Sequence, residues 1–136
     1  MLEITDLKKS FRTPEGRMVE VVNLESFTLA AGVQAALRGV SGSGKTTLLN
    51  LIAGIVAADS GTVRIDGAEM TSLPEAGRDR LRAEKIGYIF QTFNLLQGHT
   101  ALENVLLGMG FGPRGADRSQ ARQWLERVGL AHRLDH

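Results

Sequence analysis

The sequence of 136 residues lacks cysteine, has only three prolines, and contains few aromatic residues, at 5% of the total. Without cysteine, neither a disulfide framework nor a thiolate metal site can form. Neither sign of charge dominates, since 16 lysines and arginines stand against 15 aspartates and glutamates. A polybasic arm for nucleic acid is therefore excluded. The longest apolar run, Leu48–Ala58, is interrupted by Asn50 and is too short to span a bilayer.

The residues that are present suit a folded domain. Hydrophobic residues make up 43% of the chain and charged residues 23%, which is sufficient for one core of ordinary size and too apolar for disorder. The first eleven residues carry four charged side chains and no apolar run of signal-peptide length. We expect a soluble, cytosolic protein.

Short apolar segments separated by turn residues predict strands, followed by strands mixed with helices. Turns are predicted at Thr13–Gly16 and at Asp66-Gly67, where proline and glycine favour them. The predicted strands contain Leu2–Ile4, Val19–Val22, Phe27–Leu29, Val33–Leu37, Val63–Ile65 and Ile86–Phe90. The predicted helices are Thr46–Ile55, ended by Gly54; Glu75–Lys85; and a last helix with an apolar stripe at Ala121, Trp124, Leu125 and Val128, between Asp117 and Gly129.

The segment Gly39–Thr47 fits the phosphate-loop pattern G-x-x-x-x-G-K-[ST]. Glycines without Cβ atoms let the backbone curl and point its N–H groups at a phosphate, and the helix that follows adds its positive dipole end. Lys45 is expected to contact the β- and γ-phosphates, and the Thr46 hydroxyl to bind Mg²⁺. The candidate nucleotide-binding residues of the loop are Gly39, Ser41, Gly42, Ser43, Gly44, Lys45, Thr46 and Thr47.

Motifs beyond the loop carry a resemblance to a family. The sequence resembles the ATP-binding subunits of ABC transporters, and most of all the branch of lipoprotein-release, macrolide-export and cell-division ATPases. The resemblance covers essentially the whole chain. The segments that carry it are Ser41–Leu49, Asp59–Val63, Asp66-Gly67, Ile86–Gln91, Phe93–Leu96 and Thr100–Val105.

This resemblance implies an α/β fold, an ABC-type nucleotide-binding domain of the P-loop NTPase class. Residues 1–90 would form an N-terminal antiparallel β subdomain with the P-loop core. Residues 91–136 would form the Q-loop and the beginning of the helical subdomain. ATP and Mg²⁺ are the implied cofactors.

Two further site residues follow from the resemblance alone. Gln91 matches the Q-loop glutamine, which together with Lys45 is implied to act in catalysis and with Thr46 to bind Mg²⁺. Phe11 matches an aromatic residue that stacks on adenine, and a phenylalanine keeps the π-face required for stacking. From the residues alone, Gln91 could equally be the polar end of a buried strand, and Phe11 a core residue.

Several motifs of the family are absent from these residues. The chain contains no Leu-Ser-Gly-Gly-Gln signature and no four-residue apolar run that ends in Asp-Glu, and it stops at Leu134–His136. We therefore expect an incomplete domain, the N-terminal part of such an ATPase. Taken alone, it should be marginally stable and bind nucleotide without turnover.

The expected function is that of an ABC transporter ATP-binding subunit, which couples Mg-ATP hydrolysis to export or release of a substrate. Its expected partners are a transmembrane permease and a second ATP-binding subunit, with no nucleic acid. Its expected place is peripheral, on the cytoplasmic face of the inner or plasma membrane. The alternatives are a non-catalytic remnant, an ABC ATPase of cell division, and a P-loop kinase or GTPase. The absence of an Asn-Lys-x-Asp motif disfavours a GTPase.

Overall fold

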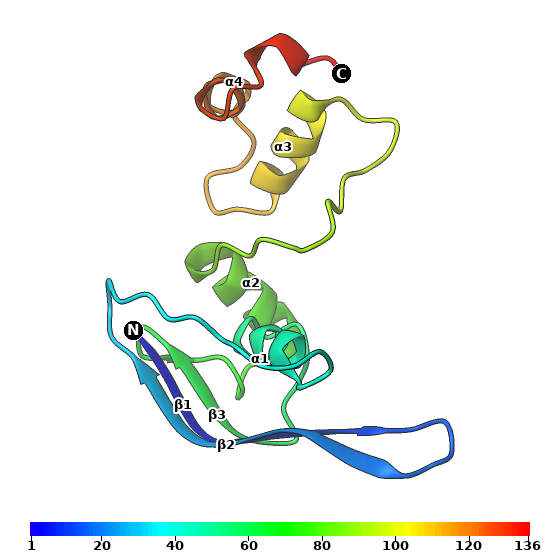
Figure 1. Cartoon of the computed structure of the whole chain (residues 1–136). Helices are drawn as coiled ribbons and strands as arrows, with labels where there is room; N and C mark the ends of the chain where they lie inside the picture. Colours follow the sequence, from blue (N-terminus) through cyan, green and yellow to red (C-terminus); the bar gives the residue numbers. More distant parts are fainter. The chain divides into compact units, whose positions relative to one another are not determined.

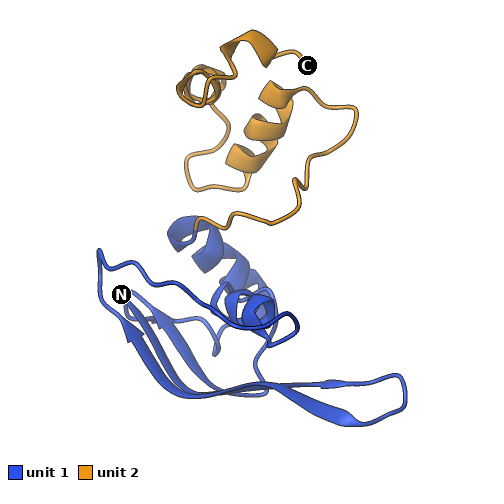
Figure 2. Cartoon of the chain, in the orientation of Figure 1, with its two compact units in different colours: residues 1–86 blue, residues 87–136 orange.

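The computed structural model describes residues 1–136 and divides them into two compact units, Met1–Ile86 and Gly87–His136 (Figures 1 and 2). Each unit has a hydrophobic cluster of its own. The boundary predicted from the family resemblance, between residues 90 and 91, falls close to this division.

The first unit is built on a four-stranded antiparallel sheet in the order β2-β1-β3-β4. Its strands are β1 (Leu2–Arg12), β2 (Met18–Leu29), β3 (Ser60–Ile65) and β4 (Ala68–Glu69). The β1–β2 hairpin extends well beyond β3 (Figure 1). Its turn lies at the predicted place, where Gly16 takes a φ of 84° and its N–H donates to the carbonyl of Thr13. The predicted N-terminal antiparallel β subdomain is confirmed.

The second predicted turn joins β3 to β4. Asp66 has a φ of 48° and Gly67 a φ of 81°, both in the left-handed region. Two successive residues with positive φ form the type I′ turn that matches the twist of a hairpin. Asp66 is therefore a turn residue, as predicted.

Two helices pack in the first unit, α1 (Lys45–Ile52) and α2 (Glu75–Lys85). α2 has the predicted extent. α1 ends before the predicted Ile55 because Gly54 takes a φ of 67° and its N–H bonds to the carbonyl of Leu51. The Arg82 guanidinium of α2 donates to the carbonyl of Ala53 at 3.2 Å and so caps the end of α1.

The core of this unit lies between α1 and the sheet. Leu51 of α1 is 1% exposed and clusters with Leu7 of β1, Val63 of β3 and Met70, none of which is exposed. Burying an aliphatic side chain of this size contributes about 1.5–3 kcal/mol. This packing fixes α1, and with it the loop that precedes α1, against the sheet.

Two predicted strands, Val33–Leu37 and Ile86–Phe90, do not form strands in the structure. Val33, Leu37 and Phe90 are about half exposed, and Ile89 is 96% exposed. An apolar run predicts a buried strand only when a neighbour completes its backbone hydrogen bonds. Here the sheet contains only β1 to β4, so neither segment has a partner strand. The prediction was wrong because pairing depends on a neighbour and not on the segment itself.

The second unit consists of α3 (Ala101–Gly110), α4 (Arg118–Arg127) and the 3-10 turn η1 (Ala131–Arg133) around a small core of Leu102, Ala121 and Leu125. As predicted, Asp117 caps α4, its Oδ1 accepting from the N–H groups of Ser119 and Gln120 at 2.8 and 3.0 Å. Gly129 follows with a φ of 78°. No helix of the chain is long and apolar enough to cross a membrane.

The apolar stripe of α4 is wider than the surface that its neighbours cover. Ala121 and Leu125 are buried, whereas Trp124 is 44% exposed and Val128 69% exposed. From its place on the apolar stripe, Trp124 is interpreted as a core residue or a helix contact; it is not buried in the core of this unit, and a helix contact stays a prediction. No helix was predicted at α3, although Thr100 and Glu103 form a complete capping box at its start, whose pattern is readable in a sequence.

Candidate functional site

The glycine-rich segment Gly39–Thr47 forms a loop that leads directly into α1. Gly42 and Gly44 have φ values of 79° and 85°, a backbone region that glycine adopts without a steric cost. Gly44 is the N-cap of α1, and no side chain makes a capping bond there. The N–H groups of the first turn are thus available to an external acceptor, and the helix dipole favours an anion at the same place. This cradle fits a phosphate group.

The loop packs against β2 at Gly44. A Cβ atom placed on Gly44 would lie 2.5 Å from the carbonyl oxygen of Val21, closer than real Cβ atoms come to any atom. Val21 is the extra residue at the irregularity of the β1–β2 ladder, where Lys9 pairs with Val22 and Ser10 with Glu20. Gly44 is therefore needed both for its backbone angle and for this close approach.

The Lys45 ammonium is held at the loop. Its Nζ donates to the carbonyls of Gly39 at 2.8 Å and Val40 at 2.7 Å, and to the Ser43 hydroxyl at 3.4 Å. These contacts place a positive charge beside the N-terminus of α1. The expected contact of Lys45 with the β- and γ-phosphates stays a prediction, and this position of the ammonium is compatible with it.

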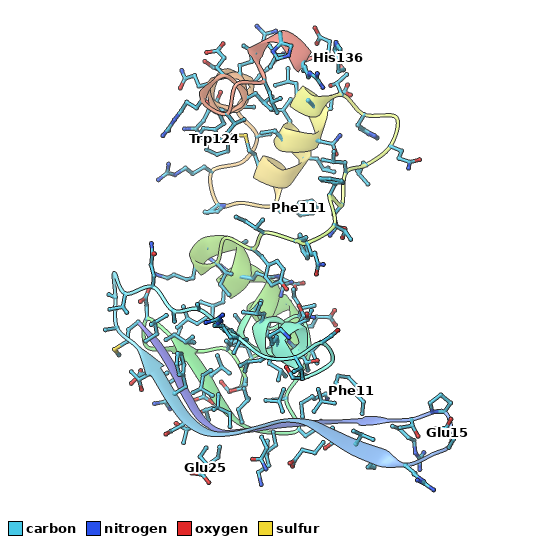
Figure 3. All side chains as sticks on the ribbon, in the orientation of Figure 1. Phe11, Glu15, Glu25, Phe111, Trp124 and His136 are labelled. Carbon is cyan, nitrogen blue, oxygen red and sulfur yellow. The ribbon has the colours of Figure 1, made fainter.

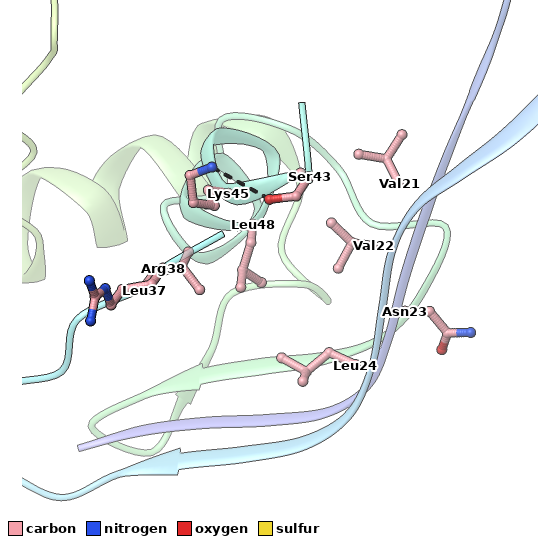
Figure 4. Close-up of a pocket in the computed structure, with 10 residues that line it drawn as sticks. Val21, Val22, Asn23, Leu24, Leu37, Arg38, Ser43, Lys45 and Leu48 are labelled. Carbon is pink, nitrogen blue, oxygen red and sulfur yellow. Dashed lines mark hydrogen bonds between the residues drawn. The ribbon is translucent and has the colours of Figure 1, made fainter. Parts of the chain in front are cut away.

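A pocket of 210 Å³ lies along one side of the loop (Figure 4). Val21 and Leu24 of β2 line it together with Leu37, Lys45 and Leu48. This volume is below the 300–1,000 Å³ of ordinary small-molecule pockets. Arg38 also lines the pocket, and Figure 4 shows its guanidinium directed away from Lys45.

The remaining predicted loop residues differ in exposure. Ser41 and Thr46 are exposed, and Thr47 is half-buried in the first turn of α1. No group of three or more His, Asp or Glu side chains could hold a metal ion. Mg²⁺ is commonly bound by one or two protein oxygens together with substrate phosphates and waters. The Thr46 hydroxyl, next to a phosphate cradle, fits this mode.

Phe11 lies near the end of β1, opposite Val19 of β2, and is 42% exposed. Figure 3 shows its ring on the side of the hairpin on which α1 lies, with Glu25 on the other side. The Lys9 ammonium lies 5.4 Å from the centroid of this ring. Phe11 is not buried in the core, and its partly exposed ring has a surface on which a planar group can stack.

Gln91 belongs to the second unit, whereas the loop and Phe11 belong to the first. It is exposed in a bend that follows residues 86–90, which form neither helix nor strand. The alternative interpretation, that Gln91 is the polar end of a buried strand, does not hold in this chain because no strand forms there. Lys45 and Gln91 are not brought together within one unit.

Asp59 is a partner of β1 that was not predicted from the sequence. Its two carboxylate oxygens accept from the Lys9 ammonium and from the Ser10 N–H, each at 2.7 Å. These bonds, with that of Lys9 first, lower the pKa of Asp59 below its usual value. No local signal reveals such contacts, because the partners lie about 50 residues apart in the chain.

Acid should weaken the folded state through four exposed carboxyls, of which Glu15 has its pKa lowered by a hydrogen bond with the Thr13 side chain. In the other three, hydrogen bonds lower the pKa of Asp59 (from Lys9), Asp66 (from the N-terminal ammonium) and Glu103 (from the Thr100 N–H). A folded pKa below the unfolded value of about 4 stabilises the fold above that pH, and the contribution is lost as pH falls through the folded pKa. We expect the urea concentration at the midpoint of unfolding to be the same at pH 7 and pH 6, and to decrease when the pH is lowered below about 4. A midpoint that rises on acidification would contradict this.

Comparison with known proteins gives a consistent result. The model of the family described as ABC transporter matches residues 22–136. Among curated proteins, the lipoprotein-releasing system ATP-binding protein LolD of Pseudomonas fluorescens is 40% identical over the whole chain, and LolD 2 of Rhodospirillum rubrum is 43% identical. The macrolide export ATP-binding/permease protein MacB of Syntrophobacter fumaroxidans is 37% identical.

The chain spans 60% of the length of these two LolD proteins and 19% of the MacB protein. Among solved structures, the ATP-binding cassette MJ0796, a dimer in a post-hydrolysis state with ADP and Pi, superposes with a TM-score of 0.90 at 31% identity. The superposition covers all of this chain and 61% of that one.

Proposed function

Because the chain belongs to the ABC transporter family, we propose that it is the N-terminal part of an ATP-binding subunit that couples Mg-ATP hydrolysis to a membrane permease. The observation that carries this proposal is the loop before α1. There, two left-handed glycines, an uncapped helix N-terminus and the Lys45 ammonium lie together.

In this proposal each residue acts according to its chemistry. The loop N–H groups and Lys45 bind the β- and γ-phosphates, and Thr46 supplies a hydroxyl oxygen for Mg²⁺. Phe11 stacks on the adenine ring. Gln91 orients the water that attacks the γ-phosphate and contributes to the Mg²⁺ site, since a carboxamide can do both without adding charge. The bound Mg²⁺ would neutralise the charge that develops on the phosphates.

We propose that these 136 residues, taken alone, bind ATP without steady turnover. No apolar run of the chain ends in the Asp-Glu pair that supplies a general base in the family. The loop can then position the phosphates, but no general base takes the proton from the attacking water. Because general-base catalysis contributes about 10²–10⁴-fold in rate, hydrolysis should be slower by about that factor. Steady ATP hydrolysis that Lys45→Ala abolishes would contradict this proposal.

The proposed partners are a transmembrane permease and a second ATP-binding subunit. Support comes from the LolD and MacB proteins, whose names refer to lipoprotein release and to a permease, and from the dimeric MJ0796 cassette. The proposed place is the cytoplasmic face of the membrane. Release of a lipoprotein or export of a small substrate are the two candidate activities of the complete complex.

Binding of ATP with and without Mg²⁺ tests the site. We expect calorimetry to show tighter binding with Mg²⁺ than with EDTA for the wild type, and a clearly smaller difference for Thr46→Ala, which lacks the hydroxyl ligand. Thr5→Ala, at an exposed position of β1, is the matched control and should behave like the wild type. If neither chain binds ATP, a non-catalytic remnant becomes the better interpretation.

A further inference from the structure

Asp59 binds three consecutive residues of β1. Its carboxylate accepts from the Lys9 ammonium and from the Ser10 N–H, and its own N–H donates to the carbonyl of Lys8 at 3.0 Å. Asp59 immediately precedes β3, whose first residue, Ser60, pairs with Lys8. The carboxylate therefore joins the start of β3 to the middle of β1.

This junction lies at the irregularity of the β1–β2 ladder. The register shifts between Lys9 and Ser10, which are the two residues that donate to Asp59, and the extra residue of β2 is Val21. Bulges change the direction of a strand and re-aim the side chains that follow. Beyond this point β1 continues into the part of the hairpin that carries Phe11.

The Lys9 ammonium connects the carboxylate to the ring of Phe11. It lies 2.7 Å from Asp59 Oδ1 and 5.4 Å from the Phe11 ring centroid. The Lys9 side chain is only 16% exposed, whereas that of Asp59 is 44% exposed. A cation over a ring face is attracted by the quadrupole of the ring, and a carboxylate that holds the cation in place makes this contact directional.

We propose that Asp59, acting through Lys9 and the bulge, is a positioning residue that holds the Phe11 ring in place for an adenine base. This inference rests on the proposed function, since it assumes that Phe11 stacks on the base. Asp59 itself need not touch the nucleotide. Its loss should affect recognition of the base and leave binding of the phosphates at Gly39–Thr47 intact.

The test compares two ligands, ATP and inorganic tripolyphosphate, bound by the 136-residue chain in the presence of Mg²⁺. Removing Phe11 with Phe11→Ala should weaken ATP by about tenfold or more, as for loss of one base–aromatic stack. Asp59→Asn keeps an oxygen for the Ser10 N–H but loses the charge that holds Lys9. We expect this variant to weaken ATP by about two- to fivefold and to leave tripolyphosphate unchanged. Adding Asp59→Asn to Phe11→Ala should weaken ATP no further.

Two test variants have a matched control. Lys8→Met is the control for Lys9→Met, and Glu25→Gln is the control for Asp59→Asn. Lys8 on β1 and Glu25 on β2 are exposed and make none of these contacts through their side chains. Equal weakening of both ligands by Asp59→Asn would overturn the inference in favour of general damage to the fold. Unchanged ATP binding in Asp59→Asn, or in Phe11→Ala, would overturn it as well. A different result would contradict the proposed phosphate site and not the role of Asp59: Lys45→Ala that binds tripolyphosphate as tightly as the wild type.

Discussion

Replacing Lys45 by alanine should weaken ATP binding by about 10- to 150-fold, since a hydrogen bond to a charged group contributes about 1.5–3 kcal/mol. The ammonium is held by the carbonyls of Gly39 and Val40, so in the wild type it is already fixed at the loop before a phosphate binds. Fluorescence titration with a labelled ATP analogue would measure the change. Lys45→Met should have a similar effect, because the apolar stem of lysine contributes little to a phosphate contact.

Lys8→Ala is the matched control for this prediction. Lys8→Ala also removes one positive charge from the first unit. The exposed Lys8 side chain, however, lies on β1 and is not part of the loop Gly39–Thr47. We expect affinity within about twofold of the wild type, since removal of a distant exposed charge is largely screened by salt. If Lys8→Ala and Lys45→Ala weaken ATP equally, net charge and not the loop determines binding, and the assigned role of Lys45 is wrong.

Gly61→Ala should reduce the free energy of unfolding by roughly 2–6 kcal/mol, through backbone strain and overlap together. Gly61 has a φ of 87°, and a Cβ atom there would lie 2.3 Å from the carbonyl oxygen of Asp6. The overlap is with the backbone of β1, which cannot move aside as the end of a flexible side chain could. Asp6 itself has a φ of 49°, so the two strands are irregular at the same place. Urea unfolding followed by circular dichroism measures the loss.

Gly67→Ala separates the two causes. Gly67 has a φ of 81°, close to that of Gly61, but a Cβ atom there would meet nothing within 4 Å. This variant should therefore show only the conformational cost, about 1–3 kcal/mol. Equal losses in the two variants would mean that backbone strain alone accounts for Gly61, and that the close approach of β1 has no energetic consequence.

Several features carried by contiguous residues were predicted correctly, although α3 was missed despite its local capping box. The turns at Thr13–Gly16 and Asp66-Gly67, the extent of α2 and the Asp117 cap depend on local backbone angles and on hydrogen bonds between near neighbours in the chain. Such preferences operate whatever the rest of the fold does. The left-handed glycines before α1 and the start of α1 belong to the same class, because they are consecutive, whereas phosphate binding there stays a prediction.

Features that need two distant segments were not predicted. Val33–Leu37 and Ile86–Phe90 have the composition of strands but no partner in the sheet, and Trp124 lies on an apolar stripe that its neighbours do not cover. In each case the side chains indicate that burial is favourable. They do not indicate which surface buries them, because burial depends on apolar area and not on the identity of the neighbour.

The absence of cysteine and the balanced charge limited the kinds of site, and the phosphate-loop motif by itself identified the candidate phosphate-binding residues. Only the tertiary structure showed that β2 approaches this loop and that Asp59, just before β3, binds β1. Two contacts join segments that are far apart in the chain: Val21 approaches Gly44, and Asp59 bonds to Lys9 and Ser10. The exposure of Phe11 likewise depends on how the whole unit packs. Local sequence sets backbone angles, whereas distances between such segments are set by packing of the whole unit.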